Sequence, residues 1–184
     1  MANKKISDLT AAGSALSTHQ FEVNESGTSK RVTGEQIWDG VDTRYLFGCA
    51  VRHNAAQTIN DSAWTAVAFN TEVSDDGAFH DTVTNNDRIT VPAGEGGIYV
   101  VTFSGSFASN STGNRGARIQ KNGTAVAQTM IAAVNGDVTG LDVTYIVKLV
   151  PTDYMNVVVW QSSTAALNLQ SAYIHFGAAR CSRS

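Results

Sequence analysis

From about residue 47 onward the chain alternates apolar and polar side chains in short runs, and this period of two constrains its fold most. In the run 99–107, Tyr99, Val101 and Phe103 share one face while hydroxyl side chains occupy the other. The run 141–149 repeats the pattern with leucine, valine and tyrosine. Such alternation is typical of β-strands with one buried face, so the sequence predicts an all-β domain.

Turn residues separate these runs at short intervals. Asn122-Gly123 lies between two alternating runs, and this pair favours the two-residue turn of a β-hairpin. A second turn at Pro151 to Asp153 leads into the run 154–161, whose residues Val157 to Trp160 are apolar on both faces. A strand of this kind lies inside a sandwich or against another subunit.

The same criteria indicate further strands at 64–69, 88–91 and 172–178. About eight to ten strands within one domain fit an antiparallel sandwich of two sheets, of the jelly-roll type. No internal repeat of propeller or solenoid length is visible.

Composition and charge exclude several classes of partner. The formal net charge is -3, which argues against nucleic acid as the main ligand. No run approaches the roughly 20 apolar residues of a membrane helix. Because the two lysines at the start precede no apolar run, we expect no secretory signal and synthesis in a cytoplasm.

The first 46 residues form a different segment. Phe21 and Val23 fit a short strand, a turn follows at Asn24 to Ser29, and Lys30 to Val32 fit a second strand. Thr33 then resembles the cap of a short helix. This piece cannot bury enough apolar surface alone, so it must dock on its own neighbours or on a larger assembly. The predicted domains are therefore 1–46 and 47–184.

Catalytic and metal-binding patterns are weak. The four histidines are scattered, and no serine has the strand-turn-helix context of a hydrolase nucleophile, so we expect no enzyme. The acidic stretch after residue 71 is the exception, because hard cations prefer carboxylate oxygens. Its candidate calcium ligands are Glu72, Asp75, Asp76, Asp81 and Asp87. Their spacing does not match an EF-hand loop, so a solvated acidic loop is the favoured interpretation, and no other cofactor is expected.

The two cysteines, Cys49 and Cys181, lie near the ends of the larger segment. Their spacing fits neither a metal site nor a redox motif. For a protein made in the cytoplasm we expect two free thiols, and a disulfide stays open as the alternative.

Spaced motifs of the larger segment resemble the globular head of complement C-one-q and its tumour necrosis factor-like and phage relatives. They are Trp64 to Phe69, Asp76-Gly77, Asn85 to Pro92, Gly97 to Val101, Lys121 to Gly123 and Phe176 to Ala178. The resemblance covers about residues 47–180. It implies a jelly roll of ten strands that assembles as a homotrimer.

Apolar residues on the predicted strands are candidates for the trimer interface. They are Tyr145, Val158, Trp160 and Phe176. An alternative use of aromatic residues is sugar recognition, in which Trp160 and Tyr154 stack on a ring while Arg115 and Arg118 donate hydrogen bonds. Packing is the favoured interpretation.

The first segment is similar to the leading part of fibre, spike and head-appendage proteins of tailed phages, where it attaches the protein to the particle. Lys5 to Gly13, Phe21 to Asn24 and Ser29 to Ile37 carry this resemblance. The attachment candidates are Ile6, Leu9, Phe21, Val23, Lys30, Arg31, Val32 and Ile37.

The favoured function is therefore a structural virion protein, a trimeric head fibre or decoration protein that docks on capsid proteins and adheres in some cases to host glycans. A tail or receptor-binding fibre and a free trimeric lectin-like module remain alternatives. No collagen-like stalk is present, which argues against an animal complement protein.

Overall fold

The computed structural model describes residues 20–33, 47–172 and 174–183. The chain divides into two compact units, Met1–Arg44 and Tyr45–Ser184. In the first unit, β1 (Gln20–Glu25) and β2 (Thr28–Thr33) form an antiparallel hairpin that turns at Ser26 and Gly27. The predicted pair of short strands is confirmed, and the predicted helix after Thr33 lies outside the described residues.

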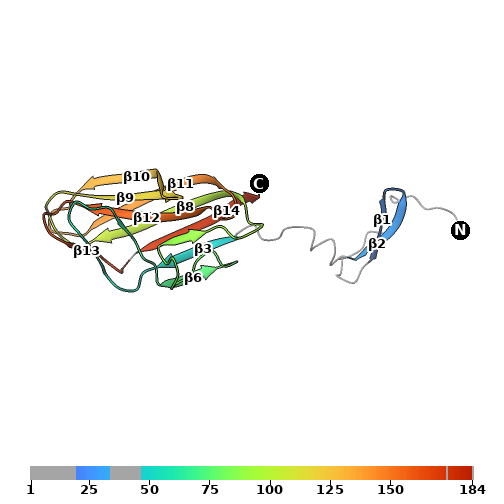
Figure 1. Cartoon of the computed structure of the whole chain (residues 1–184), viewed down its shortest axis with the longest axis horizontal. Helices are drawn as coiled ribbons and strands as arrows, with labels where there is room; N and C mark the ends of the chain where they lie inside the picture. The colour runs from blue at the N-terminus through green and yellow to red at the C-terminus, as the bar shows by residue number, and fades with distance from the viewer. Residues whose placement is uncertain (1–19, 34–46, 173, 184) are drawn as a thin grey trace, which may run out of the picture. The chain divides into compact units, whose positions relative to one another are not determined.

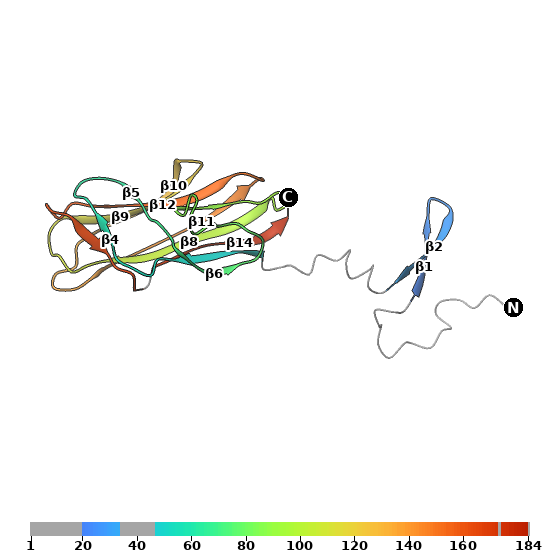
Figure 2. The ribbon, with the colours of Figure 1, turned by 60° about the horizontal axis from the view of Figure 1, so that its bottom comes forward.

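The second unit is a sandwich of two antiparallel sheets (Figures 1 and 2). The seven-stranded sheet contains β4 (Gln57–Ile59), β13 (Leu167–Leu169), β8 (Gly97–Phe107), β14 (His175–Arg183), β3 (Phe47–Arg52), β6 (Thr71–Asp75) and β11 (Thr139–Leu149). The five-stranded sheet contains β10 (Thr124–Ala132), β9 (Asn114–Lys121), β12 (Tyr154–Gln161), β5 (Thr65–Ala66) and β7 (Arg88–Thr90). The described residues contain no helix, so the all-β prediction is confirmed.

Two predicted strands have different bounds in the structure. The run 64–69 provides only the short β5, because the chain leaves the sheet after Ala66. The last strand begins at His175 and continues to Arg183. Phe176 and Ala178 of this strand, and Ile174 just before it, are buried as the predicted alternation requires, whereas Ala172 is exposed.

The core lies between the two sheets and consists of the side chains that alternate inward. Tyr99, Val101, Phe103 and Phe107 of β8 are completely buried, as the pattern predicts. Across the sandwich, β12 contributes its own buried valines, and all of these residues belong to one continuous cluster. The alternation of apolar and polar residues therefore indicates which face of each strand packs against the opposite sheet.

Two turns at one end of the five-stranded sheet hold each other in place. Asn122 and Gly123 both have positive φ, 49° and 80°, as the predicted turn requires. The Asn122 amide donates to Asp153 (2.7 Å), and its oxygen accepts from the backbone of Tyr154 (2.8 Å). The predicted turn residues thus link two connections that are distant in sequence.

Asp153 is largely buried within this pair of turns. Burial raises the pKa of the Asp153 carboxyl. Hydrogen bonds from Lys121, the Val150 amide and Asn122, together with the charge of Lys121, lower it by more than burial raises it. The net pKa lies below the ordinary value. The ionised form is therefore favoured more in the folded chain than in the unfolded chain.

The lowered pKa of Asp153 predicts that the free energy of unfolding decreases at acidic pH. The contribution of ionised Asp153 to folding stability is complete above the ordinary carboxyl pKa. It disappears as the pH falls through the lower pKa of the folded state. Asp153→Asn should therefore melt at a lower temperature than the natural chain at pH 7, and the difference should shrink toward pH 2. Thermal unfolding followed by circular dichroism at several pH values tests this, and a constant difference would contradict it.

A buried ion pair lies beside the start of β8. Arg180 is 3% exposed and its guanidinium pairs with the carboxylate of Glu95, whose backbone oxygen also accepts from the Tyr99 hydroxyl. Arg183 approaches the same carboxylate at 4.0 Å, with about half of its side chain exposed. The pair ties the loop before β8 to the last strand.

Both cysteines are free thiols, Cys49 buried and Cys181 exposed, which confirms the first of the two interpretations. Burial, with smaller effects from Asp75, Glu72 and Asp76, raises the pKa of the Cys49 thiol. None of the described segments forms a helix that could span a membrane.

Candidate functional site

The outward side of the five-stranded sheet gathers aromatic and arginine side chains, and we call it the aromatic face. It comprises Trp64, Arg88, Gly116, Arg118, Gln120, Gln128, Met130, Tyr154, Asn156, Val158 and Trp160. Strand register explains this grouping, because Trp160 pairs with Gly116, Val158 with Arg118 and Asn156 with Gln120. Every second residue of the strand then points away from the core.

A stack of planar groups lies at the centre of this face. The guanidinium of Arg118 lies 3.8 Å from the centroid of the Trp64 ring, and its Nε donates to Gln128 Oε1 (2.6 Å). The rings of Trp64 and Trp160 have centroids 6.2 Å apart and are tilted by 31°. Packing on one side and a hydrogen bond on the other therefore fix the plane of the guanidinium.

Gly116 leaves the space that the stack occupies. A Cβ atom there would lie 3.2 Å from the outer edge of the Trp64 ring and 3.1 Å from the terminal carbon of Met130. Trp64 enters from the side of β5, so its ring crosses β12 to reach this position on β9. The ring is only partly exposed and shields the strand beneath it.

A second arginine-aromatic pair lies on the β7 side of β12. The guanidinium carbon of Arg88 is 4.6 Å from the centroid of the Tyr154 ring. Next to it, Asn156 donates to Gln120 Oε1 (3.1 Å), while Asn156 Oδ1 and Arg88 Nε have no hydrogen-bond partner. Unsatisfied buried polar atoms are rare enough that they mark a place where a ligand or water can bind.

The predicted sugar-binding set is only partly brought together. Arg118, Tyr154 and Trp160 lie on the aromatic face, but the prediction for Arg115 is wrong because Arg115 is completely buried. Its guanidinium donates to the backbone oxygens of Asn110, Thr112 and Asn114 and holds the loop before β9. Trp64 and Arg88 were missed as site residues, although each is the first residue of a strand that the sequence pattern predicts.

The outward side of the seven-stranded sheet carries small and apolar residues. We call it the small-residue face, and it consists of Gly48, Ala50, Val100, Thr102, Ile146, Gly177 and Ala179. One row crosses four strands from Ile146 through Val100 and Ala179 to Gly48, and Ile146 is 66% exposed. The four residues of this row carry no charge.

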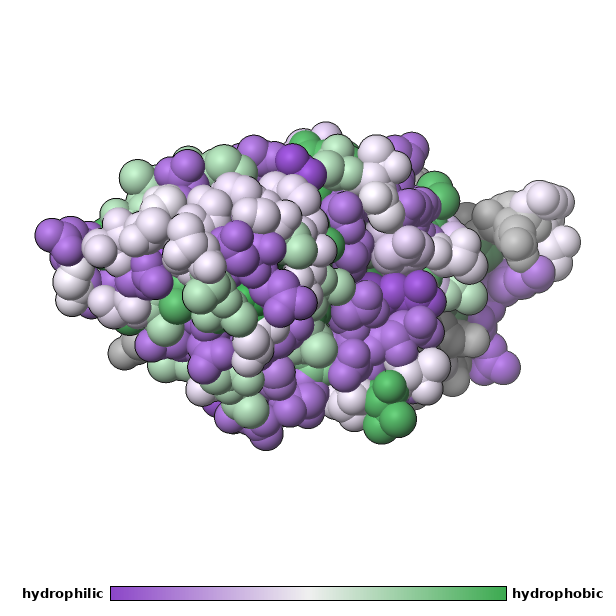
Figure 3. All heavy atoms as spheres, turned by 60° about the vertical axis from the view of Figure 1, so that its left-hand side comes forward, coloured by the Kyte–Doolittle hydropathy of each residue, from purple (hydrophilic) through white to green (hydrophobic). Residues whose placement is uncertain are grey.

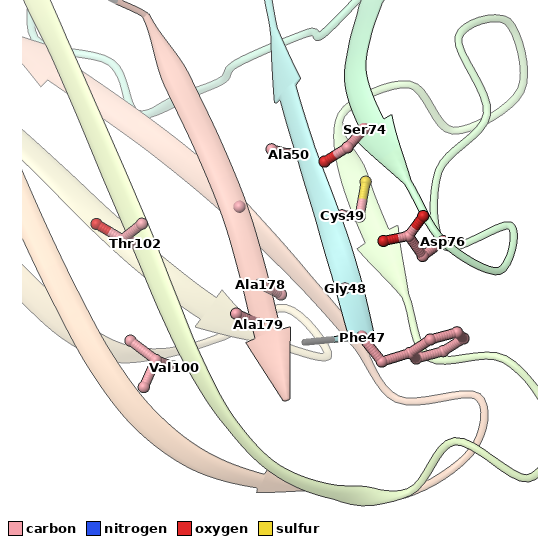
Figure 4. A pocket seen from close by; sticks show the side chains of 11 residues that line it. Phe47, Gly48, Cys49, Ala50, Ser74, Asp76, Val100, Thr102, Ala178 and Ala179 are labelled. Atoms are coloured by element: carbon pink, nitrogen blue, oxygen red, sulfur yellow. The ribbon is translucent and has the colours of Figure 1, made fainter. Parts of the chain in front are cut away.

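A shallow hollow of about 400 Å³ lies over β3, β14 and β8 on this face (Figure 4). Its walls include the side chains of Ser74 and Asp76 beside β3 and those of Val100 and Thr102 on β8. Glycine at 48 keeps the strands close, because a Cβ atom there would lie 2.1 Å from the backbone oxygen of Ala178. Short side chains therefore create the hollow.

The four predicted interface residues separate into two pairs. Phe176 is 1% exposed and stacks on Phe69 inside the chain, with ring centroids 5.3 Å apart, so its assignment to a trimer interface is wrong. Tyr145 also packs against the core of the single chain. Val158 and Trp160 point outward and belong to the aromatic face.

The acidic residues act locally on their own loop. Asp75 accepts from the backbone of Phe79 (2.9 Å) and His80 (3.0 Å), and Asp81 accepts from the backbone of Val83 and Thr84. Glu72 lies 3.3 Å from His80 Nδ1. Asp76 is exposed and Asp87 half-buried. Within residues 20–33, 47–172 and 174–183, no three such groups are close enough to hold a metal ion.

The attachment candidates fall only partly within the described residues. Val23, Lys30 and Arg31 are exposed on the N-terminal hairpin, and Val32 is half-buried. Phe21 lies opposite Val32 in the hairpin. Ile6, Leu9 and Ile37 lie outside the described residues.

The sequence matches no protein-family model and no curated protein. Solved structures do match. Murine APRIL at pH 5.0 has a TM-score of 0.57 at 14% identity, covering 73% of this chain and 98% of that chain. The fold is the jelly roll of tumour necrosis factor and complement C-one-q domains.

Two further structures show the same jelly roll. The globular domain of zebrafish complement 1qA protein has a TM-score of 0.56 at 14% identity, covering 74% of this chain and 98% of that chain. Eiger TNF from S. frugiperda has a TM-score of 0.55 at 12% identity, covering 77% of this chain and 96% of that chain. The jelly-roll prediction is confirmed, and identities this low establish the fold alone.

Proposed function

We propose that the protein is a non-enzymatic accessory protein of a tailed-phage particle, a trimer of jelly rolls attached to the head through the first 46 residues. The observation that carries the proposal is the small-residue face. Ile146 is exposed in one row with Val100 and Ala179, and water contact with such a surface is unfavourable. A second copy of the same chain covers it in the proposed assembly.

The shape of the face supports self-association. Its centre is apolar, while Asp142 and Lys148 occupy outward positions of β11 on either side of Ile146. An apolar centre with a charged rim is typical of protein interfaces. The resemblance to complement C-one-q heads implies three copies, which also fits the confirmed jelly-roll fold.

The N-terminal unit supports attachment to a particle. It is a separate compact unit whose hairpin exposes Val23, Lys30 and Arg31. Its sequence resembles the leading segment of phage appendage proteins, and the described chain offers no long shaft, which favours the head over the tail. Three such units on one trimer convert a weak contact into durable binding through effective concentration.

Two measurements on the full chain and a variant lacking residues 1–40 test this proposal. Light scattering should give each protein about three times the mass of its own chain, which is 19.5 kDa for the full chain and smaller for the shortened one. Only the full chain should sediment with phage particles purified from the strain that encodes it. A monomeric full chain would refute the assembly, and equal sedimentation of the shortened protein would refute the attachment role.

A free lectin-like module is the second candidate, and the aromatic face is the observation that favours it. In that case the protein would bind a glycan and would be absent from purified particles. Mass spectrometry of such particles distinguishes the two functions.

A further inference from the structure

We propose that the aromatic face binds an acidic saccharide, a glycan whose rings carry carboxylates, at the Arg118–Trp64 stack. This inference rests on the jelly-roll unit alone and holds whether or not the protein is part of a virion. It extends the structural role to recognition of a defined chemical class.

The first argument is the orientation of Arg118. Its Nε is used by Gln128 and its plane is fixed over Trp64, so the two terminal nitrogens form a fork that no described side chain engages with a hydrogen bond. A fixed guanidinium fork matches the two oxygens of a carboxylate. Its orientation before binding reduces the entropy that the ligand contact would otherwise cost.

The second argument is the pair of indole rings beside this fork. Trp64 and Trp160 both retain exposed surface, and their ring centroids are 6.2 Å apart. Such rigid aromatic surface packs against the C–H groups of a sugar ring at a small cost in conformational entropy. A uronic acid presents both features together, an apolar ring face and a carboxylate at its edge.

The third argument is the charge of the face. Arg88 and Arg118 both lie on it, and none of the outward residues of β9, β12 and the paired part of β10 is acidic. The whole chain nevertheless has a net charge of -3, so general electrostatic attraction would not draw a polyanion to it. Binding of an acidic glycan must therefore be local to this face.

The fourth argument is the spare hydrogen-bonding capacity between the two arginines. Asn156 lies at the centre of the face with 7% of its surface exposed, and its Oδ1 has no hydrogen-bond partner. Nε of Arg88, which lies opposite Asn156 in the sheet, also lacks one. Both atoms are shielded from solvent in the single chain, so a sugar hydroxyl, which both donates and accepts, would satisfy them only after the side chains above them turn aside.

The test uses the full chain with oligogalacturonate, whose rings each carry a carboxylate, and with a neutral maltooligosaccharide of equal length. We expect oligogalacturonate to quench tryptophan fluorescence and to bind at least about tenfold more tightly than the neutral sugar, a difference of about 1.4 kcal/mol. Calorimetry gives both dissociation constants. No quenching and no binding at millimolar oligogalacturonate would overturn the proposal.

Three variants locate the site. Arg118→Gln should weaken binding of oligogalacturonate about tenfold, and Arg118→Lys should restore only part of the loss because lysine has no planar fork. Arg52→Gln is the matched control, because Arg52 is an exposed arginine of the other sheet. Melting temperatures of all three should match the natural chain. An equal loss in Arg52→Gln would show unspecific attraction and overturn the assignment.

A final measurement separates carboxylate from phosphate as the recognised group. Poly(glycerol phosphate) presents the same negative charge without sugar carboxylates. Its binding should be weaker than that of oligogalacturonate. Tighter binding that depends on Arg118 would show that the face recognises a phosphate polymer and would refute the acidic-saccharide assignment.

Discussion

Ile146→Asp should convert the assembled protein into folded monomers. Ile146 is 66% exposed in a single chain, so aspartate there costs the isolated jelly roll little. In the proposed trimer the same carboxylate would be buried against a second copy without a partner, a cost of several kcal/mol. Light scattering should therefore show a threefold lower mass, while the melting curve of the monomer remains cooperative.

Val83→Asp provides the matched control. Val83 is also an exposed β-branched apolar residue, with 85% of its surface accessible, but it lies in the loop 81–87 and is not part of the small-residue face. Its mass should equal that of the natural chain. If Ile146→Asp stays assembled, the small-residue face is not the contact between copies.

Glu95→Ala should strongly lower the stability of the single chain. The change removes the carboxylate that pairs with the guanidinium of Arg180, which is 3% exposed. Breaking a buried pair by removing one partner costs about 3–5 kcal/mol. For a domain of this size the melting temperature should fall by roughly 10 °C.

Arg183→Ala is the comparison that shows whether the buried pair with Arg180 causes the loss of stability in Glu95→Ala. Arg183 approaches the same carboxylate at 4.0 Å, but its side chain is 47% exposed, so its contribution should stay below about 1 kcal/mol. Thermal unfolding of both variants measures the two effects. Equal losses would show that burial of Arg180 is not what makes the pair important.

The strands of the second unit were predictable because their chemistry is local. Alternation at 99–107 and the Asn122-Gly123 pair depend on neighbouring residues, and both predictions are confirmed. The bounds of β5 and β14 were less predictable, because the ends of these strands depend on where the partner strand stops.

The candidate sites were only partly predictable, because alternation shows that a face is buried without showing what covers it. Phe176 has the pattern of an interface residue, yet the opposite sheet of the same chain covers it. The position of Trp64 over β9 depends on the register of three strands and on the space above Gly116. Likewise, nothing adjacent to Arg115 in sequence indicates that it supports a loop from within the core.

The path of the chain through the jelly roll has a practical consequence for display of foreign peptides. Phe47 pairs with Arg180, so the first described strand of the second unit starts, and its last strand finishes, at the same end of the seven-stranded sheet. Thr139 and Phe107 pair at the other end of β8, about 35 Å away for a strand of 11 residues. Figure 3 shows polar and apolar side chains intermixed there.

A peptide fused after Arg183 would therefore leave the jelly roll at the same end of the strands as Phe47. An insertion at Asn135-Gly136 would instead lie at the far end, in an exposed loop where Gly136 has positive φ and open space around it. For presentation of an epitope or an affinity tag to the surrounding medium, this loop is the better position than the chain terminus.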